Sequence, residues 1–138
     1  MRKLLPFLLL SVLGLLSCAK DDLEVADLNN NPFDPAYVGE NLFELVSADV
    51  AYESVNGVTQ SFFRVEVRCR TDRFLSPTPF NVRYKRSNTE VWGPFQYNAT
   101  TTIIKQYGYA VGQEFCWDFQ LGNGGGIGAG NRICATVE

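Results

Sequence analysis

The residues best able to do chemistry are four cysteines, because the sequence contains no histidine. Without histidine there is no Ser-His or Cys-His nucleophile pair, no His-containing metal site and no imidazole general base. Carboxylate-only hydrolysis needs no histidine, but no Asp/Glu pair lies in a recognisable motif. Cys69, Cys116 and Cys134 are scattered and lack the Cys-x-x-Cys spacing of a zinc site. The sequence therefore predicts a protein that is not an enzyme and holds neither a metal nor another cofactor.

The fourth cysteine, Cys18, stands at the end of an N-terminal targeting segment. Arg2 and Lys3 precede an apolar run that is too short for a permanent span of ~20 residues. The run ends at residues 15–18, Leu-Leu-Ser-Cys, which resemble the lipobox of bacterial lipoproteins. The resemblance implies that residues 1–17 are a removed signal peptide and that lipid on Cys18 holds the protein to a membrane. The alternatives are an ordinary signal peptide with a chance cysteine, or a plain membrane anchor.

The residues just after this cysteine extend the resemblance. Lys20, Asp21 and Asp22 place a lysine before two acidic residues. This order is similar to the export signal of surface lipoproteins of Bacteroidota. The resemblance implies a protein on the outer face of the outer membrane, while the alternative is an ordinary acidic tether.

Residues 18–41 are interpreted as the lipidated cysteine and a flexible tether. The stretch is acidic, contains an asparagine run and two prolines, and shows no sustained apolar period. The alternative is that residues 31–35, Asn-Pro-Phe-Asp-Pro, dock on the following domain through Phe33. One domain is expected at 42–138.

From residue 42 onward the pattern changes to short strands. Residues 61–70 alternate apolar and charged side chains, which is typical of a half-buried strand. Asn56-Gly57 is the strongest two-residue hairpin signal. Alternation, or enrichment in β-branched and aromatic residues, also marks 42–55, 80–85, 91–97, 100–105, 115–121 and 132–137. About seven strands without an amphipathic helix predict an all-β fold, a single antiparallel β-sandwich, with a small barrel as the alternative.

Residues 112–137 resemble the last two strands of a fibronectin type III or immunoglobulin-like domain. A turn containing Gly112 precedes an aromatic residue, Phe115, and alternating apolar residues follow up to a glycine-containing loop. The resemblance implies a fibronectin type III or immunoglobulin-like sandwich over 42–138, and it says little about function. Phe115 stands where a tyrosine is usual, so the hydroxyl contact of the tyrosine corner is absent.

The oxidising compartment implied by the leader permits a disulfide. Cys116 and Cys134 each share a face with polar neighbours, so both are expected to point outward on adjacent antiparallel strands. This placement favours a Cys116–Cys134 bond and leaves Cys69, on an apolar face, as a small core residue. The competing pair, Cys69 with Cys116, would mimic the inter-sheet bridge of immunoglobulins and would turn Trp117 outward.

A glycine-rich segment lies at residues 122–130. It resembles a phosphate-binding loop only in composition, because no following helix or Lys-Ser/Thr pair supports it. It is interpreted as a loop between the last two strands, with Gly124, Gly125 and Gly126 as candidate ligand contacts.

Two aromatic residues near expected turns, Trp92 and Tyr107, are predicted to be exposed candidate contacts for a sugar ring or a protein. The segment 64–86 is rich in basic side chains. These are expected to be solvated strand faces and partners of the acidic tether, or else to attract acidic glycans or lipopolysaccharide phosphates. They are Arg64, Arg68, Arg70, Arg73, Arg83, Lys85 and Arg86.

These observations favour a non-catalytic, lipid-anchored cell-envelope protein. The formal net charge of −3 argues against nucleic acid as a partner. The expected partners are the membrane, through lipid on Cys18, and an outer-membrane protein complex in which the domain is a binding or assembly module. The alternative is an independent surface receptor or adhesin for a glycan or host ligand.

Overall fold

The computed structural model describes residues 30–74, 79–124 and 126–138. The predictions for residues 1–17, Cys18 and Lys20–Asp22 lie outside them. The described elements, in chain order, are β1 (Phe43–Val55), β2 (Val58–Cys69), the 3-10 helix η1 (Thr71–Arg73), β3 (Asn81–Arg86), β4 (Gln96–Tyr97), β5 (Thr101–Gln106), β6 (Glu114–Asn123) and β7 (Gly126–Thr136). Within those ranges there is no helix of the length and apolarity that a membrane crossing requires.

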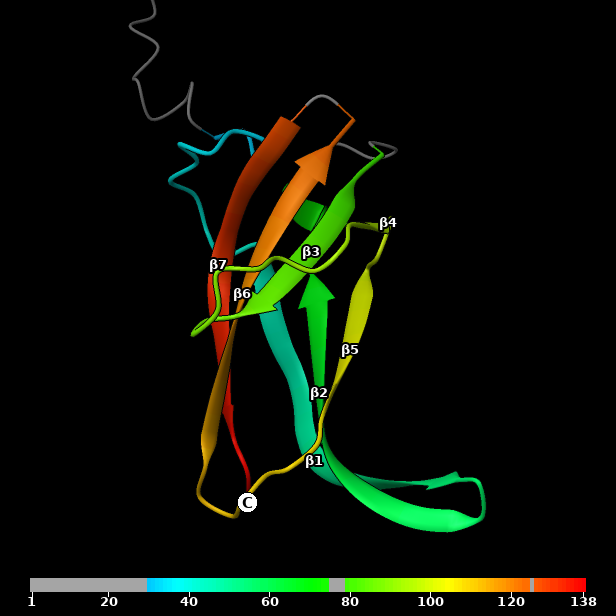
Figure 1. The fold of residues 1–138 in the computed structure, drawn as a ribbon. Coiled ribbons are helices and arrows are strands. Elements are labelled where there is room, and N and C mark those ends of the chain that lie inside the picture. The colour runs from blue at the N-terminus through cyan, green and yellow to red at the C-terminus, as the bar shows by residue number, and fades with distance from the viewer. Residues whose placement is uncertain (1–29, 75–78, 125) are drawn as a thin grey trace, which may run out of the picture.

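Two antiparallel sheets pack face to face (Figure 1). One sheet has the strand order β1-β2-β5 and the other has the order β4-β3-β6-β7. Two packed antiparallel sheets with seven strands in all are the architecture of a β-sandwich. The predicted all-β antiparallel sandwich is therefore confirmed.

The core forms where the inward faces of the two sheets meet. Phe43 and Phe63 from one sheet, and Trp117 and Phe119 from the other, are among the largest fully buried side chains. Cys69 is a buried free cysteine, as predicted. Burial, followed by the nearby Asp72 carboxylate, raises the pKa of its thiol to about 12. This thiol therefore stays protonated and serves as a small core side chain.

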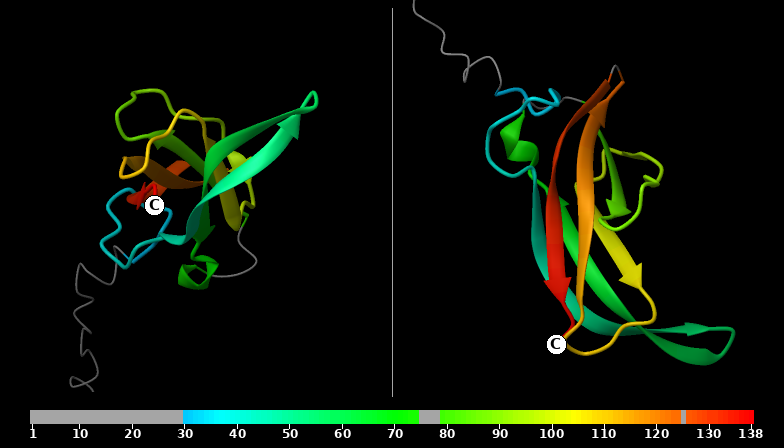
Figure 2. Two further views of the ribbon diagram at one scale, coloured as in Figure 1. Left: turned by 90° about the horizontal axis from the view of Figure 1, so that it is seen from below. Right: turned by 60° about the vertical axis from the view of Figure 1, so that its left-hand side comes forward.

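The β1–β2 ribbon turns at the predicted hairpin and extends beyond the sandwich. Asn56 and Gly57 both have positive φ, 52° and 78°, as a type I′ turn requires. Strand β5 pairs with β2 only from Phe63 to Arg68, so residues 51–62 have no third strand beside them. We call residues 51–62 the arm. Figures 1 and 2 show it leaving the sandwich at the end opposite residues 30–41.

The prediction of a strand at residues 91–97 is wrong for most of that segment. Only Gln96–Tyr97 is a strand, and it pairs with the start of β3. Pro94 has no N–H to donate to a ladder. The Gly93 N–H instead donates to the Tyr84 carbonyl at 2.9 Å, and the preceding residues form a connection that crosses the four-stranded sheet (Figure 1).

The prediction of a loop at residues 122–130 is also wrong, because most of this segment belongs to the β-hairpin that β6 and β7 form. Two of its glycines, Gly128 and Gly130, lie where another part of the backbone approaches closely. A Cβ on Gly128 would lie 2.7 Å from the Pro32 carbonyl oxygen, and one on Gly130 would lie 1.9 Å from the Phe119 carbonyl oxygen. Gly130 sits at a register shift between β6 and β7, where the two backbones approach closely.

The segment before β1 packs on the sandwich, as in the docking alternative for Phe33. The Phe33 ring lies 5.2 Å from the ring of Phe74, and Phe74 lies equally far from Phe80. The Ala129 N–H of β7 donates to the Pro32 carbonyl at 3.0 Å. The part of the predicted tether near residues 32–33 is therefore fixed to the beginning of β7.

One polar side chain joins the edges of the two sheets. The Asn131 carboxamide, on β7, accepts hydrogen bonds from the N–H groups of Leu42 and Phe43 at 3.1 and 2.9 Å. Its amide nitrogen donates to the Phe43 carbonyl at 3.0 Å. This side chain thus takes the place of a neighbouring strand beside the start of β1.

Candidate functional site

The base of the arm is held by a cluster of polar and aromatic side chains. The Glu53 carboxylate accepts hydrogen bonds from the ammonium of Lys105 and the hydroxyl of Tyr107, and from Gln60 Nε2 at 3.0 Å. The Tyr107 ring lies 5.8 Å from the ring of Phe62, which is itself buried. Because Lys105 and Tyr107 come from the end of β5, the cluster braces the arm against the sandwich.

The cluster predicts a pH dependence. Hydrogen bonds from Lys105, and then from Tyr107, lower the pKa of Glu53 from 4.5 to about 2. The stabilisation that Glu53 supplies is therefore present above pH 4.5 and is lost as the pH falls toward 2. We expect Glu53→Gln to lower the unfolding temperature at pH 7, with a difference from the wild type that shrinks toward pH 2. A carboxyl NMR titration should give a midpoint near 2 for Glu53, and one near 4.5 would contradict the bracing. Glu90→Gln, at an exposed position, is the control.

The rest of the arm is exposed and uncharged. Tyr52, Val55 and Val58 are 72%, 44% and 67% exposed. No ionisable side chain occurs from residue 54 to residue 63. A neutral ribbon with unpaired edges and exposed apolar side chains is a surface that suits contact with another protein.

The structure separates the two aromatic residues predicted as contacts. Tyr107 is 45% exposed, as predicted, and lies at the end of the three-stranded sheet. Trp92 is half-buried rather than exposed, and it lies against the four-stranded sheet. The Arg83 guanidinium carbon lies 4.7 Å from the centre of the Trp92 ring, and Lys85 Nζ lies 5.4 Å from it. These two cations hold the indole ring in place, so Trp92 and Tyr107 do not form one site.

An open depression lies beside this indole. Its volume is about 240 Å³, and Trp92, Asp118, Gln120 and Arg132 contribute to its lining. The Asp118 carboxylate accepts hydrogen bonds from Arg132 Nε at 2.7 Å and from Ser87 Oγ at 3.0 Å. The bond from Arg132, ahead of the one from Ser87, lowers the pKa of Asp118, so this carboxyl is ionised at neutral pH. The depression is a small hollow with one aromatic side and a polar floor.

The cysteines on the same outer face form the predicted bond. Cys116 and Cys134 lie directly opposite each other on β6 and β7 and are joined as a disulfide, with their Cα atoms 4.1 Å apart. Glu114 lies close to both sulfurs. Because the sulfurs are bonded to each other, this cluster offers no thiolate for a metal ion.

Of the glycines predicted as ligand contacts, Gly124 and Gly126 lie at the other end of the molecule from the arm. Gly124 follows β6 and Gly126 begins β7, while Gly125 lies outside the described residues. Their hairpin end is near residues 30–41 (Figure 1). No contact in the described part of the chain singles them out as a binding surface.

The basic residues of 64–86 do not form one patch, because they lie on both sheets. Arg64 pairs with Asp49 at 2.8 Å on the outer face of the three-stranded sheet, whereas Arg83 belongs to the four-stranded one. Arg73 donates to Glu40 in the segment before β1. This last pair agrees with the expectation that some of these cations partner the acidic tether.

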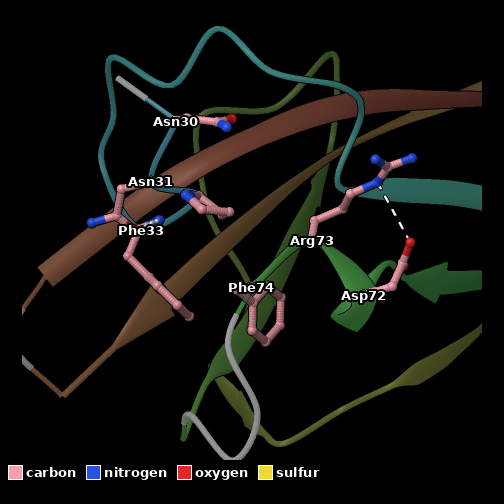
Figure 3. Close-up of a pocket in the computed structure, with 7 residues that line it drawn as sticks. Asn30, Asn31, Phe33, Asp72, Arg73 and Phe74 are labelled. Carbon is pink, nitrogen blue, oxygen red and sulfur yellow. Dashed lines mark hydrogen bonds and ion pairs between the residues drawn. The ribbon is translucent and has the colours of Figure 1, made fainter. Parts of the chain in front are cut away.

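A second depression lies where the described chain begins. It has a volume of about 470 Å³ and is lined by residues 30–33 and 72–74. Figure 3 shows Phe33 and Phe74 on its wall, with Arg73 paired to Asp72 beside them. The contacts of Phe33 and Glu40 make this region the docking place of the N-terminal segment, so we do not assign it a ligand.

No protein-family model matches the chain, and neither a curated protein nor a solved structure is significantly similar to it. The fold is an antiparallel β-sandwich of a three-stranded and a four-stranded sheet. A fold of this class serves many unrelated functions, so function has to be argued from particular surfaces.

Proposed function

We propose that this protein is a non-catalytic, lipid-anchored binding or assembly module of an outer-membrane protein complex, facing the cell exterior. The observation that carries the proposal is the arm. It projects from the sandwich, is braced at its base by Glu53, and carries exposed apolar side chains toward its tip.

The position of the arm suits a membrane-anchored module. It leaves the sandwich at the end far from residues 30–41 (Figure 1). With lipid on Cys18, the chain from Cys18 to Asn30 reaches at most ~40 Å from the membrane. An arm at the opposite end is then available to a partner beyond the lipid headgroups.

The composition of the arm suits a protein partner. Tyr52 is an aromatic side chain of the kind that contributes most to protein interfaces. The unpaired backbone edges of a two-stranded ribbon also bind an added strand. Val55 and Val58 lie opposite each other on one face of the ribbon and Tyr52 lies on the other face, so the arm presents exposed apolar side chains on both faces.

A pull-down of the native, lipidated protein in gentle detergent tests the proposal. The wild type is expected to recover a stoichiometric outer-membrane protein, and a Tyr52→Ser/Val58→Ser variant is expected to recover at least tenfold less. Val91→Ser/Val111→Ser removes side chains that are 79% and 80% exposed elsewhere, and it should behave as the wild type. Recovery of the protein alone, or equal recovery by the arm variant, would contradict the proposal.

The anchor has its own test. Cys18→Ala is expected to abolish labelling by a radioactive fatty acid and to leave the signal peptide uncleaved. Unchanged lipid labelling would show that another residue carries the anchor. Protease added to intact cells is expected to degrade the wild-type protein, whereas protection would place it on the inner side of the membrane.

A further inference from the structure

The depression beside Trp92 has the properties of a small binding site. It lies on the outer face of β6 and β7, next to the β3–β4 connection that crosses in front of the four-stranded sheet (Figure 1). At about 240 Å³ it is smaller than the 300–1,000 Å³ typical of sites for drug-sized ligands. It therefore has room for about one sugar-sized ring.

The Trp92 ring, which forms the aromatic side of the depression, is held in place without a ligand. Arg83 and Lys85 lie against the Trp92 ring, and Arg83 also lies 4.8 Å from the centre of the Phe95 ring. Gln120 Oε1 accepts hydrogen bonds from Arg83 Nε and Nη2 at 3.1 and 2.7 Å, which fixes the guanidinium in turn. A ring held in this way loses little conformational entropy when a sugar stacks on it.

The polar side chains on the floor of the depression are also held in place by hydrogen bonds. One hydrogen-bond donor among them has no partner. Asp118 holds Arg132 through Nε at 2.7 Å and Nη2 at 3.4 Å. Arg132 Nη1 has no partner among the described residues, and the side chain is 59% exposed. Asp118 already accepts from Arg132 and Ser87, so it is a positioning residue, and Arg132 is the group that is free to contact a ligand.

The charge around the depression selects the ligand. The charged side chains that contact Trp92 or Asp118 in the described part of the chain are Arg83, Lys85 and Arg132. The single carboxylate of Asp118 leaves two positive charges in excess, which attracts an anion. We propose that this depression binds one acidic sugar residue of a glycan, with its ring against Trp92 and its carboxylate on Arg132. The proposal does not depend on the arm or on the membrane anchor.

Titration of the purified full-length protein with oligosaccharides tests the proposal. The probes are oligomers of galacturonate, glucuronate and sialic acid, each paired with its neutral counterpart. We expect at least one acidic oligomer to bind ten or more times more tightly than its neutral counterpart, and to bind more weakly in 1 M NaCl. Because Trp117 is 1% exposed and Trp92 is the only other tryptophan, a change in tryptophan fluorescence should accompany binding. Absence of binding to all three acidic probes, or equal affinity for the neutral ones, would overturn the proposal.

Substitutions test the location by calorimetry. Arg132→Gln and Trp92→Leu are each expected to weaken binding at least tenfold, while Trp92→Phe keeps an aromatic ring and should retain binding within about threefold. Arg64→Gln removes an arginine that pairs with an aspartate on the outer face of the other sheet, and it should not change sugar binding. Arg132 is exposed, so its loss should leave the thermal unfolding of the protein nearly unchanged. Undiminished binding by the Arg132→Gln variant would show that the sugar binds elsewhere.

Discussion

Replacing Asn131 with leucine is expected to lower the free energy of unfolding by about 2–4 kcal/mol. The substitution removes two acceptor contacts and one donor contact at the start of β1. Leu42 and Phe43 are 2% and 1% exposed, so water cannot readily replace the lost partner. Each buried polar backbone group left without a partner costs about 1–3 kcal/mol. Urea denaturation of the full-length protein at pH 7 measures the change.

Two further variants separate this effect from the loss of any asparagine. Asn131→Asp retains the acceptor oxygens for both N–H groups but loses the donor to the Phe43 carbonyl, so its cost should lie between those of the wild type and the leucine variant. Asn88→Leu changes an exposed asparagine in the β3–β4 connection and should stay within about 0.5 kcal/mol of the wild type. A cost below that limit for Asn131→Leu would mean that β1 is held in place without it.

The alternation of side chains was enough to predict the sandwich and its disulfide. The polar neighbours two residues away from Cys116 and from Cys134 predict that both cysteines face outward, and the register places them opposite each other. Cys69 was assigned inward on the same argument and is buried. Such predictions succeed because side chains along a strand alternate between its two faces, so the neighbours two residues away show which face a residue occupies.

The arm was not predicted, although both of its strands and its turn were. Its length depends on where β5 stops pairing with β2, at Phe63 and Gln106. That end point is a tertiary contact between segments about forty residues apart, and no local pattern records it.

The wrong predictions of a loop at residues 122–130 and of an exposed Trp92 have a common cause. The sequence predicts a mobile loop from the glycine content and an exposed tryptophan from its place near an expected turn. In the structure the backbone approaches Gly128 and Gly130 closely, and Trp92, in the β3–β4 connection, lies against two cations of β3. These contacts arise only when distant strands meet, so the sequence alone does not distinguish them from a mobile loop.

The two proposed surfaces are independent, which makes their tests separable. The arm extends the three-stranded sheet, whereas the depression lies on the outer face of the four-stranded one. Changes at Tyr52 and Val58 should leave sugar binding intact, and a change at Arg132 should leave recovery of a protein partner intact. A protein that showed both activities would link an envelope complex to an acidic glycan.

Removing the disulfide is the other large effect that we expect. Replacing Cys116 and Cys134 with serine should lower the free energy of unfolding by about 3 kcal/mol, because the bond closes a segment with a sequence separation of 18. For a domain of about 100 residues this corresponds to a fall of at least ~10 °C in unfolding temperature. Both sulfurs lie on the outer face, so serine hydroxyls there reach water and add no burial cost.

Reductant provides the internal control for this prediction. Dithiothreitol should lower the unfolding temperature of the wild-type protein to nearly that of the double variant and should not change the variant itself. Cys69→Ala should keep the full response to reductant, since the buried Cys69 thiol takes no part in the bond. Peptide mapping without reduction should recover the Cys116–Cys134 link. A Cys69–Cys116 link would instead join the two sheets through the core and would require Trp117 to face solvent, contrary to its 1% exposure.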